Sequence, residues 1–274
     1  MKGSALKKLL ALLVAVLLLL TAAGCGSGSG KYSPDDDNSL QRVLDAGELV
    51  LGLDTEFPPM GFVDESGEIT GFDIDVAQEV CDRLGVTLVK RGIVWDEKEN
   101  DLSSRRIDCI WNGLSVTPGR EKIMNLSDPY MKNELIVVVP GDSKIKSLRD
   151  LSGKKVGVQS GSTAQEVLDD PVEYPDVSIK PFDNVMRLLD SLEQKKVDAA
   201  LLDSVAAYYS IFSKDEKYYI LSDSLGEEEY AVGFRKNDHK LRDKVQEIIS
   251  SIKADGTLGE ISKKWFGSDI TIVK

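Results

Sequence analysis

Three polar stretches break local structural rules, and such breaks concentrate at functional sites. The first surrounds Arg120, which follows an apolar strand pattern and a helix start formed by Thr117 and Pro118. This start places Arg120 in the first helical turn, where the helix dipole disfavours a cation. A guanidinium held there is suited to binding an anion. An exposed arginine paired with Glu121 is the plainer alternative.

The second stretch is QSGSTAQE, residues 159–166. Gly161 permits a tight turn, and Thr163 with Glu166 forms a capping-box pattern that predicts Thr163 as the cap of a helix. The unpaired backbone N–H groups at such a helix start can hold a carboxylate. Every capped helix has these groups, so this pattern is weak when taken alone.

The third is Asp203, which ends an apolar strand pattern over residues 197–202 and precedes a helical run. In open α/β sheets, ligands lie beyond the carboxyl ends of strands, and an acid there can bind an ammonium. A lone aspartate at this place is more often a simple helix cap. Together the three stretches complement a zwitterion such as a free amino acid. Its carboxylate would face Arg120 and the amides around Ser115 and Thr163, and its ammonium would face Asp203.

The segments that must position these residues alternate between helix and strand, which is the pattern of an α/β protein. Periodicity and terminating glycines predict helices at 40–46, 74–84 and 240–265, and strands at 48–53, 86–89, 107–111 and 197–202. A second round that begins at Leu148 repeats the order helix, glycine, strand, polar turn. We therefore expect two α/β lobes, since the chain is long for a single core.

Composition excludes several classes of function. The 274 residues are 42% hydrophobic and 29% charged, which argues against a disordered chain and a multi-span membrane protein. The formal net charge of -12 would repel nucleic-acid phosphates. His239 is the one histidine, and with three cysteines it cannot supply a zinc cage or a Ser/His/Asp triad with any redundancy. No glycine fingerprint for a nucleotide occurs, so we expect no metal, no cofactor and no nucleic-acid partner.

The amino-terminal sequence is typical of a signal for export. Three lysines precede an apolar run from Leu9 to Leu20, which is too short to span a membrane and fits a secretory signal. Small residues then lead into Cys25, and this resembles the lipobox of bacterial lipoproteins, whose cysteine is acylated, with palmitate among the expected acyl chains. We expect residues 1–24 to be cleaved and residues 25–38 to form the lipidated cysteine and a flexible tether. An ordinary signal peptide with an incidental cysteine is the alternative.

Two further cysteines lie in apolar patterns, Cys81 in a helix and Cys109 in a strand. Free cysteine in such a place usually behaves as a small buried hydrophobe. We therefore favour two buried thiols, although the oxidising export compartment would also allow a disulfide.

Several motifs then occur in a recognisable order. They are GFDIDVAQEVCDRL from residue 71, LDTEFPPMGF from 53, IDCIWNGLSVTPGREK from 107, LSDPY from 126, GVQSGST from 157, KKVDAALLD from 195 and DGTLGEISKKWFG from 255. This set resembles family 3 of the bacterial solute-binding proteins, the periplasmic proteins for polar amino acids that serve ABC importers. The resemblance covers nearly all of the chain after residue 40.

The resemblance implies the periplasmic-binding-protein fold of type II, in which two α/β lobes are joined by a hinge of two crossings, with the ligand cleft between them. It implies a first lobe made of residues 39–133 plus 228–274 and a second lobe made of residues 134–227. The crossings would lie near residues 132–134 and 226–229.

The resemblance also implies the roles of individual residues. Nine residues would contact the ligand: Asp54, Phe57, Trp95, Gly113, Ser115, Arg120, Ser162, Thr163 and Asp203. Arg120, Ser115 and the backbone at Gly113 would hold the carboxylate from the first lobe, with Ser162 and Thr163 from the second, and Asp203 would take the ammonium.

The side chain of the ligand would lie between Phe57 and Trp95, near the polar Asp54. Without the resemblance, Phe57 reads as a core residue and Trp95 as a surface aromatic. Trp111 and Asn112 depart from the family pattern, since many relatives have smaller residues there, and so leave the specificity for the side chain open.

These patterns predict a binding protein and not an enzyme. It would capture a free L-amino acid by lobe closure and deliver it to the permease subunits of an ABC transporter. We expect a monomer on the outer face of the cell membrane, anchored by lipid. Two alternatives are a cyclohexadienyl-type dehydratase on the same scaffold and a sensory receptor without transport. The amino acid is left open, with glutamine, cystine, arginine and lysine among the candidates.

Overall fold

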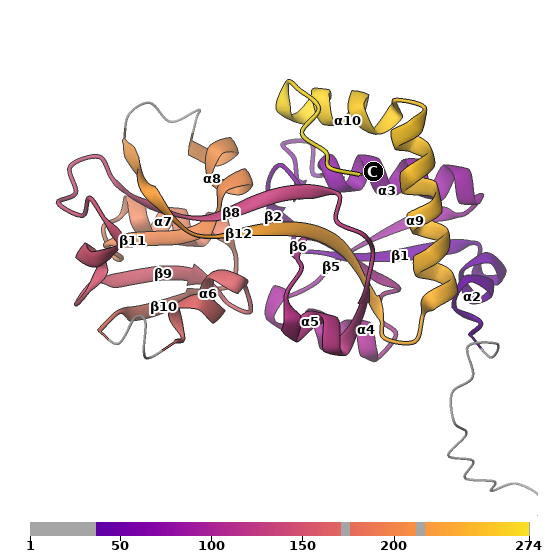
Figure 1. Ribbon diagram of the computed structural model, residues 1–274, viewed down its shortest axis with the longest axis horizontal. Coiled ribbons are helices and arrows are strands. Elements are labelled where there is room, and N and C mark those ends of the chain that lie inside the picture. Colours follow the sequence, from indigo (N-terminus) through magenta and orange to yellow (C-terminus); the bar gives the residue numbers. More distant parts are fainter. Residues whose placement is uncertain (1–36, 171–175, 212–216, 274) are drawn as a thin grey trace, which may run out of the picture. The chain divides into compact units, whose positions relative to one another are not determined.

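The computed structural model describes residues 37–170, 176–211 and 217–273 (Figure 1). The expected signal peptide, Cys25 and the tether up to residue 36 lie outside the described residues. Helices and strands alternate along the described ranges, so the predicted α/β class is confirmed. None of the helices in these ranges is long and apolar enough to cross a membrane.

The elements have the following bounds. The strands are β1 Glu48–Leu53, β2 Glu56–Phe57, β3 Gly61–Val63, β4 Ile69–Thr70, β5 Thr87–Gly92, β6 Cys109–Ser115, β7 Met124–Leu126, β8 Met131–Pro140, β9 Lys155–Gln159, β10 Ser178–Phe182, β11 Ala199–Asp203 and β12 Tyr218–Arg235. The α-helices are α2 Ser39–Ala46, α3 Phe72–Leu84, α4 Lys98–Ser103, α5 Pro118–Ile123, α6 Thr163–Leu168, α7 Val185–Glu193, α8 Ser204–Ile211, α9 His239–Ala254 and α10 Thr257–Phe266. The short 3₁₀ helices are η2 Trp95–Glu97 and η3 Leu148–Leu151.

The main sheet is built from two parallel groups. Among the described residues, nine strands form it in the order β10-β9-β11-β8-β12-β6-β1-β5, with β7 paired to β12. β1 is parallel to β5 and β6, and β9 is parallel to β10 and β11. The long strands β8 and β12 are antiparallel to each other and lie between the two groups (Figure 1). Strands β2, β3 and β4 form a small sheet of their own.

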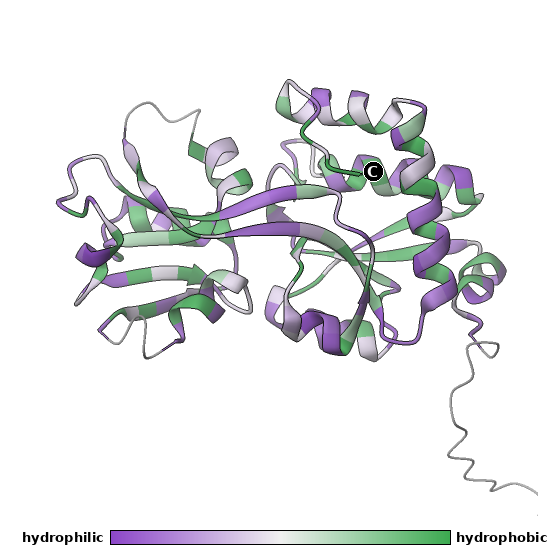
Figure 2. Cartoon of the chain, in the orientation of Figure 1, coloured by the Kyte–Doolittle hydropathy of each residue, from purple (hydrophilic) through white to green (hydrophobic). Residues whose placement is uncertain are grey.

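The central strands β1, β6, β9 and β11 are mostly buried on both faces because each face is covered by helices. In β1, Leu49 and Leu51 lie in the core that includes α3 and α9, whereas Val50 packs against the core under α4. In β8, Val138 and Val137 likewise belong to two different cores. This alternation follows from the two-residue period of a strand. Figure 2 shows the resulting hydrophobic strands and the many hydrophilic residues on α9.

Terminating glycines end two helices where the sequence predicts. Gly47 after α2 and Gly85 after α3 have φ of 68° and 76°, the left-handed conformation that glycine adopts without steric cost. The closing helix, by contrast, was predicted as one element and is two. Gly256 has φ of 90°, and the side chain of Asp255 accepts the N–H of Thr257 at 3.0 Å, so the chain turns there and α10 begins.

One strand prediction near the candidate site was displaced. The strand expected over residues 107–111 is β6, Cys109–Ser115, so Gly113 and Ser115 lie in a strand and not in a turn. The extension is a tertiary effect, because Ser115 pairs with Tyr230 of β12. Similarly, β5 runs to Gly92 since it pairs with β1 along its whole length.

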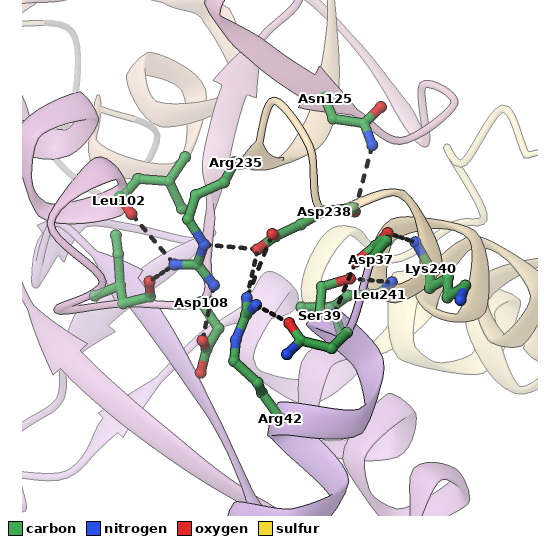
Figure 3. Close-up of polar contacts among 12 residues, drawn as sticks. Asp37, Ser39, Arg42, Leu102, Asp108, Asn125, Arg235, Asp238, Lys240 and Leu241 are labelled. Atoms are coloured by element: carbon green, nitrogen blue, oxygen red, sulfur yellow. Dashed lines mark hydrogen bonds and ion pairs between the residues drawn. The ribbon is translucent and has the colours of Figure 1, made fainter. Parts of the chain in front are cut away.

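Both ends of the described chain meet in one α/β group (Figure 3). The Asp37 carboxylate accepts the backbone N–H of Lys240 at 2.7 Å and so caps the free N–H groups at the start of α9. Arg42 on α2 pairs with Asp238 at 3.3 Å. These contacts tie the amino-terminal helix to the carboxyl-terminal helices, so this group is assembled from both ends of the sequence.

Cys81 and Cys109 are buried free thiols, which confirms the favoured prediction. Burial raises the pKa of Cys81 to about 12 and also raises the pKa of Cys109. Both thiols are therefore neutral and serve as small apolar core residues.

Candidate functional site

A cavity lies beyond the carboxyl ends of β1, β6, β9 and β11, where α/β sheets place their ligands. All nine residues predicted as ligand contacts line it: Asp54, Phe57, Trp95, Gly113, Ser115, Arg120, Ser162, Thr163 and Asp203. Six further residues line it that were not predicted as ligand contacts: Asn112, Gln159, Ala164, Val185, Leu201 and Leu202. Contact of the nine with a ligand stays a prediction.

The guanidinium of Arg120 is buried and held in place by backbone carbonyls. The predicted helix start is confirmed, since the Thr117 hydroxyl accepts the N–H of Arg120 at 3.1 Å. Nη1 donates to the carbonyl of Ser115 at 2.8 Å, and Nη2 lies 3.4 Å from the carbonyl of Gly161. Nε has no partner in the part of the chain that the structure describes. A guanidinium has five N–H donors, so several are left for an anion.

The helix cap in the second turn is Ser162 and not Thr163, which corrects the prediction. Ser162 has an extended backbone, and its hydroxyl accepts the N–H of Gln165 at 3.2 Å while donating to the carbonyl of Gln159 at 2.7 Å. Thr163 is the first residue of α6, and its hydroxyl pairs with none of the described groups. Thr163 therefore has a hydroxyl donor for a carboxylate, whereas the Ser162 hydroxyl is used within the turn.

Gly113 has a positive φ of 60°, and a β-carbon there would lie 2.9 Å from a ring carbon of Phe57. Its N–H donates to a carboxylate oxygen of Asp73 at 2.8 Å, and the Tyr130 hydroxyl donates to the same oxygen at 2.9 Å. Because that N–H is taken, a contact of Gly113 with a ligand would go through its carbonyl, which suits an ammonium. Asp73 was not predicted as a functional residue, because an acid in the first turn of a helix is ordinary.

Asp203 is a buried carboxyl at the end of β11. The Tyr230 hydroxyl donates to it at 2.6 Å, and among the described residues no lysine or arginine forms an ion pair with it. Burial, followed by the nearby Glu228 carboxylate, raises the pKa of Asp203 to about 7. Glu228 accepts the hydroxyl proton of Ser115 at 2.8 Å. The Ser115 oxygen is therefore oriented as an acceptor.

The other end of the cavity combines an acid with two aromatic rings. Gln159 donates to the carboxylate of Asp54 at 2.6 Å, and the N–H of Glu56 donates to it at 2.9 Å. Burial raises the pKa of Asp54 to about 6. Phe57 and Trp95 are each 6% exposed. Trp95 is thus not the surface aromatic that its sequence context alone suggested.

Gln159 and Asn112 were missed as lining residues. The Asn112 side-chain oxygen accepts the N–H of Asp54 at 3.1 Å, so this departure from the family pattern supports the acid. The sequence feature that could have identified them is a polar residue near the end of an apolar strand. Many turns without a functional role share this feature. No group of three or more His, Cys, Asp or Glu side chains is arranged to hold a metal ion within the described ranges.

The model of the bacterial extracellular solute-binding proteins, family 3, matches residues 49–268. The chain belongs to this family. It is 31% identical over 257 residues to the L-cystine-binding protein TcyJ of Escherichia coli K12, which covers 93% of this chain and 96% of the relative.

Two solved structures agree. Tv2483 bound to L-arginine has a TM-score of 0.83 and 30% identity, covering 86% of this chain and 98% of that one. An ABC uptake transporter substrate-binding protein from Streptococcus pneumoniae with bound histidine has a TM-score of 0.83 and 34% identity, covering 86% and 99%. The predicted two-lobed solute-binding fold is confirmed. The residues that line the cavity follow strands of both parallel groups of the main sheet.

Proposed function

We propose that this solute-binding protein captures a free polar L-amino acid between its lobes and delivers it to the permease subunits of an ABC importer. The observation that carries the proposal is the pair of opposite charges in one buried cavity. Arg120 has donors to spare, and Asp203 forms an ion pair with no lysine or arginine of the described residues. A zwitterion supplies both missing partners, and buried charges are retained only when they are paired.

The lining groups suggest a specific orientation. The α-carboxylate would accept from Arg120 and from the Thr163 hydroxyl. The α-ammonium would donate to Asp203, to the carbonyl of Gly113 and to the Ser115 oxygen, whose own proton goes to Glu228. The side chain of the ligand then extends toward Asp54, between the aromatic rings.

The side-chain end of the cavity favours a ligand with hydrogen-bond donors. The Asp54 carboxylate is buried without a cation among the described residues, and the Gln159 amide beside it has an oxygen available as an acceptor. A guanidinium, an ammonium, an imidazole or the second ammonium of cystine satisfies such acceptors. The related proteins named above bind cystine, arginine and histidine.

We place the hinge where β8 and β12 pair, with Asn133 opposite Glu228 and Lys132 opposite Glu229. The first lobe would then consist of residues 39–133 and 228–274, and the second of residues 134–227. A ligand that contacts both lobes favours the closed form and shifts the hinge equilibrium toward it. A monomer is sufficient for this mechanism.

We also propose that Cys25 is acylated and holds the protein at the outer face of the membrane. The supporting feature is the run of small residues before Cys25 after a short apolar segment. Full-length protein should fractionate with membranes and incorporate radiolabelled palmitate. Cys25→Ser should abolish the labelling and release the protein. Labelling that persists in Cys25→Ser would contradict this assignment.

The test of the binding site begins with a thermal-shift screen of the twenty amino acids plus cystine and ornithine, since a ligand stabilises in proportion to RT ln(1 + [L]/Kd). Calorimetry on the best ligand then compares Arg120→Ala with wild type. We expect the Kd to rise by about 100-fold or more, because a charged partner is lost in a desolvated site. Arg149→Ala, an exposed arginine of η3, is the matched control and should bind normally.

Three outcomes would overturn the proposal. The first is the absence of stabilisation by any ligand in the screen. The second is Arg120→Ala binding within threefold of wild type. The third is turnover of prephenate or arogenate, which would favour the dehydratase alternative. Binding with normal affinity but no effect of gene deletion on uptake would favour a sensory receptor instead.

A further inference from the structure

Lys98, the first residue of α4, is buried although it carries an ammonium. It is 2% exposed, and burial of a cation is costly unless the charge is well partnered. Its Nζ lies 3.1 Å from a carboxylate oxygen of its neighbour Glu99 and 5.1 Å from the ring centroid of Trp95. Burial, followed by the positive charge of Arg120, lowers the pKa of Lys98. The ligand pose proposed above does not use this lysine.

The hydrogen bond of Lys98 goes to the opposite lobe. Its Nζ donates to the carbonyl of Gly161 at 2.9 Å, in the turn between β9 and α6. Nη2 of Arg120 approaches the same oxygen at 3.4 Å. Two buried cations of the first lobe thus converge on one carbonyl of the second. This convergence is a direct contact between protein groups.

The same turn fits closely against the first lobe. Gly161 has φ of 69°, and a β-carbon there would lie 2.7 Å from a carboxylate oxygen of Asp96 and 2.9 Å from its Cα. Two residues earlier, Gln159 donates to Asp54 across the cavity at 2.6 Å. The turn at residues 159–161 therefore meets the first lobe through polar contacts and van der Waals packing at several points.

We propose that Lys98 and the Gly161 carbonyl form a latch that stabilises the closed lobes directly, independently of the ligand. Lys98 is then a positioning residue, which sets the fraction of closed protein before a ligand arrives. The apparent Kd equals the intrinsic Kd divided by that fraction, so the latch tightens binding without touching the ligand. Only this effect on affinity rests on the proposed function.

A substitution of Lys98 tests the latch without removing a proposed ligand contact. A substitution of Arg120 would affect both the latch and the ligand. Lys98→Met keeps the length and apolar stem but removes the charge and the donors. Lys98→Arg keeps the positive charge and the N–H donors. Lys122→Met makes the same change at an exposed lysine of α5 and is the matched control.

The experiment measures the distance between the lobes in the absence of ligand. Nitroxide labels are placed at the exposed positions Asp45→Cys on α2 and Gln194→Cys after α7, in full-length protein with Cys25→Ser. The thiols of Cys81 and Cys109 are buried and stay unlabelled. Pulsed electron paramagnetic resonance then gives the populations of short and long distances.

For Lys98→Met we expect the ligand-free short-distance population to fall at least threefold and the Kd of the identified amino acid to rise by the same factor. Lys98→Arg should restore both quantities, and Lys122→Met should change neither. A saturating ligand should still close Lys98→Met. An unchanged ligand-free distance distribution in Lys98→Met would overturn the latch.

A second variant covers the case in which Lys98→Met does not fold. Gly161→Ala places a β-carbon against Asp96 and should deplete the short-distance population from the other side of the contact. Retention of that population in Gly161→Ala would likewise contradict the proposal. Because these distances are measured without ligand, a failure of amino-acid binding would disprove the proposed function while leaving the test of the latch intact.

Discussion

Three buried carboxyls are distinguished by what each one contacts. Asp54 and Asp203 line the cavity, whereas Asp73 lies behind it and holds the N–H of Gly113 and the hydroxyl of Tyr130. Burial is the largest cause of the raised pKa in all three, about 6 for Asp54 and about 7 for the other two. Each of these carboxyls is protonated below its raised pKa, and a cation placed beside it would lower that pKa.

Ligand affinity should therefore depend on pH. Below about pH 7 the ligand-free protein holds a proton on Asp203, and an α-ammonium can pair only with the ionised form. We expect the Kd to rise about tenfold per pH unit below pH 7, since one proton must leave on binding. A ligand with a cationic side chain should steepen this slope toward two protons below about pH 6, where Asp54 is protonated as well.

Calorimetry in buffers of different ionisation enthalpy measures the protons released. Asp203→Asn is the control. This variant should bind the ligand more weakly, and its Kd should lack the part of the pH dependence that is assigned to Asp203. A Kd that stays constant between pH 5.5 and pH 8 would contradict this prediction, because it would show that Asp203 releases no proton on binding.

At the scale of elements, strand β6 presents Gly113 and Ser115 to the cavity and departs from regular geometry there. Its pairing with β12 shifts between Ala231 and Gly233, next to the positive φ of Gly113. Bulged strands of this kind reorient side chains beside functional sites. The ring of Phe57, which forms an aromatic wall of the cavity, packs directly against Gly113. A change in the backbone of β6 at Gly113 would therefore move this wall.

Gly113→Ala should therefore impair binding beyond its effect on stability. The new methyl group would lie 2.9 Å from Phe57 and 3.2 Å from Tyr230, in addition to the strain of a positive φ. We expect a Kd at least tenfold higher. Gly85→Ala is the matched control, with φ of 76° and open space around it. It should cost about 1 kcal/mol in unfolding free energy and leave the Kd unchanged.

Denaturant unfolding and calorimetry on both variants check this prediction. Equal affinities for Gly113→Ala and Gly85→Ala would show that the close approach of β6 to the aromatic wall does not matter for binding.

At the scale of the whole molecule, the buried acids affect the free energy of unfolding. Asp73 has a folded pKa of about 7, above the ordinary value of 3.8, so the folded protein keeps a proton that the unfolded chain releases between these two pH values. By linkage, the contribution of Asp73 to stability falls as the pH rises from about 4 to about 7. Above this pH the folded protein contains an ionised, buried Asp73, and the other interactions of the fold must offset the free-energy cost of burying that charge.

Asp73→Asn removes this titration. We expect the unfolding free energy of the variant, relative to wild type, to increase with pH by about 1.4 kcal/mol per unit between pH 5 and pH 7. Urea denaturation of ligand-free protein at several pH values measures the difference. A difference that is independent of pH would show that Asp73 is already ionised in the fold.

The local patterns of the chain were sufficient for much of the fold and for the charged anchors of the site. Arg120 was recognised because it sits in the wrong half of a helix dipole, and Asp203 because it ends an apolar strand. The glycines after α2 and α3 ended those helices as predicted, since a left-handed residue is a local requirement. Such features depend on residues that are neighbours in the sequence, so they can be predicted from the sequence alone.

Other features depend on partners that lie far along the chain. The true length of β6, the hydrogen bond from the Gly113 N–H to Asp73 and the burial of Lys98 belong to this class. A lysine in a short polar helix is expected to be a solvated charge, and only the fold brings the Gly161 carbonyl, in the turn between β9 and α6, to the buried ammonium of Lys98. Hydrogen-bond partners brought together by folding carry no local periodicity, so packing alone decided them.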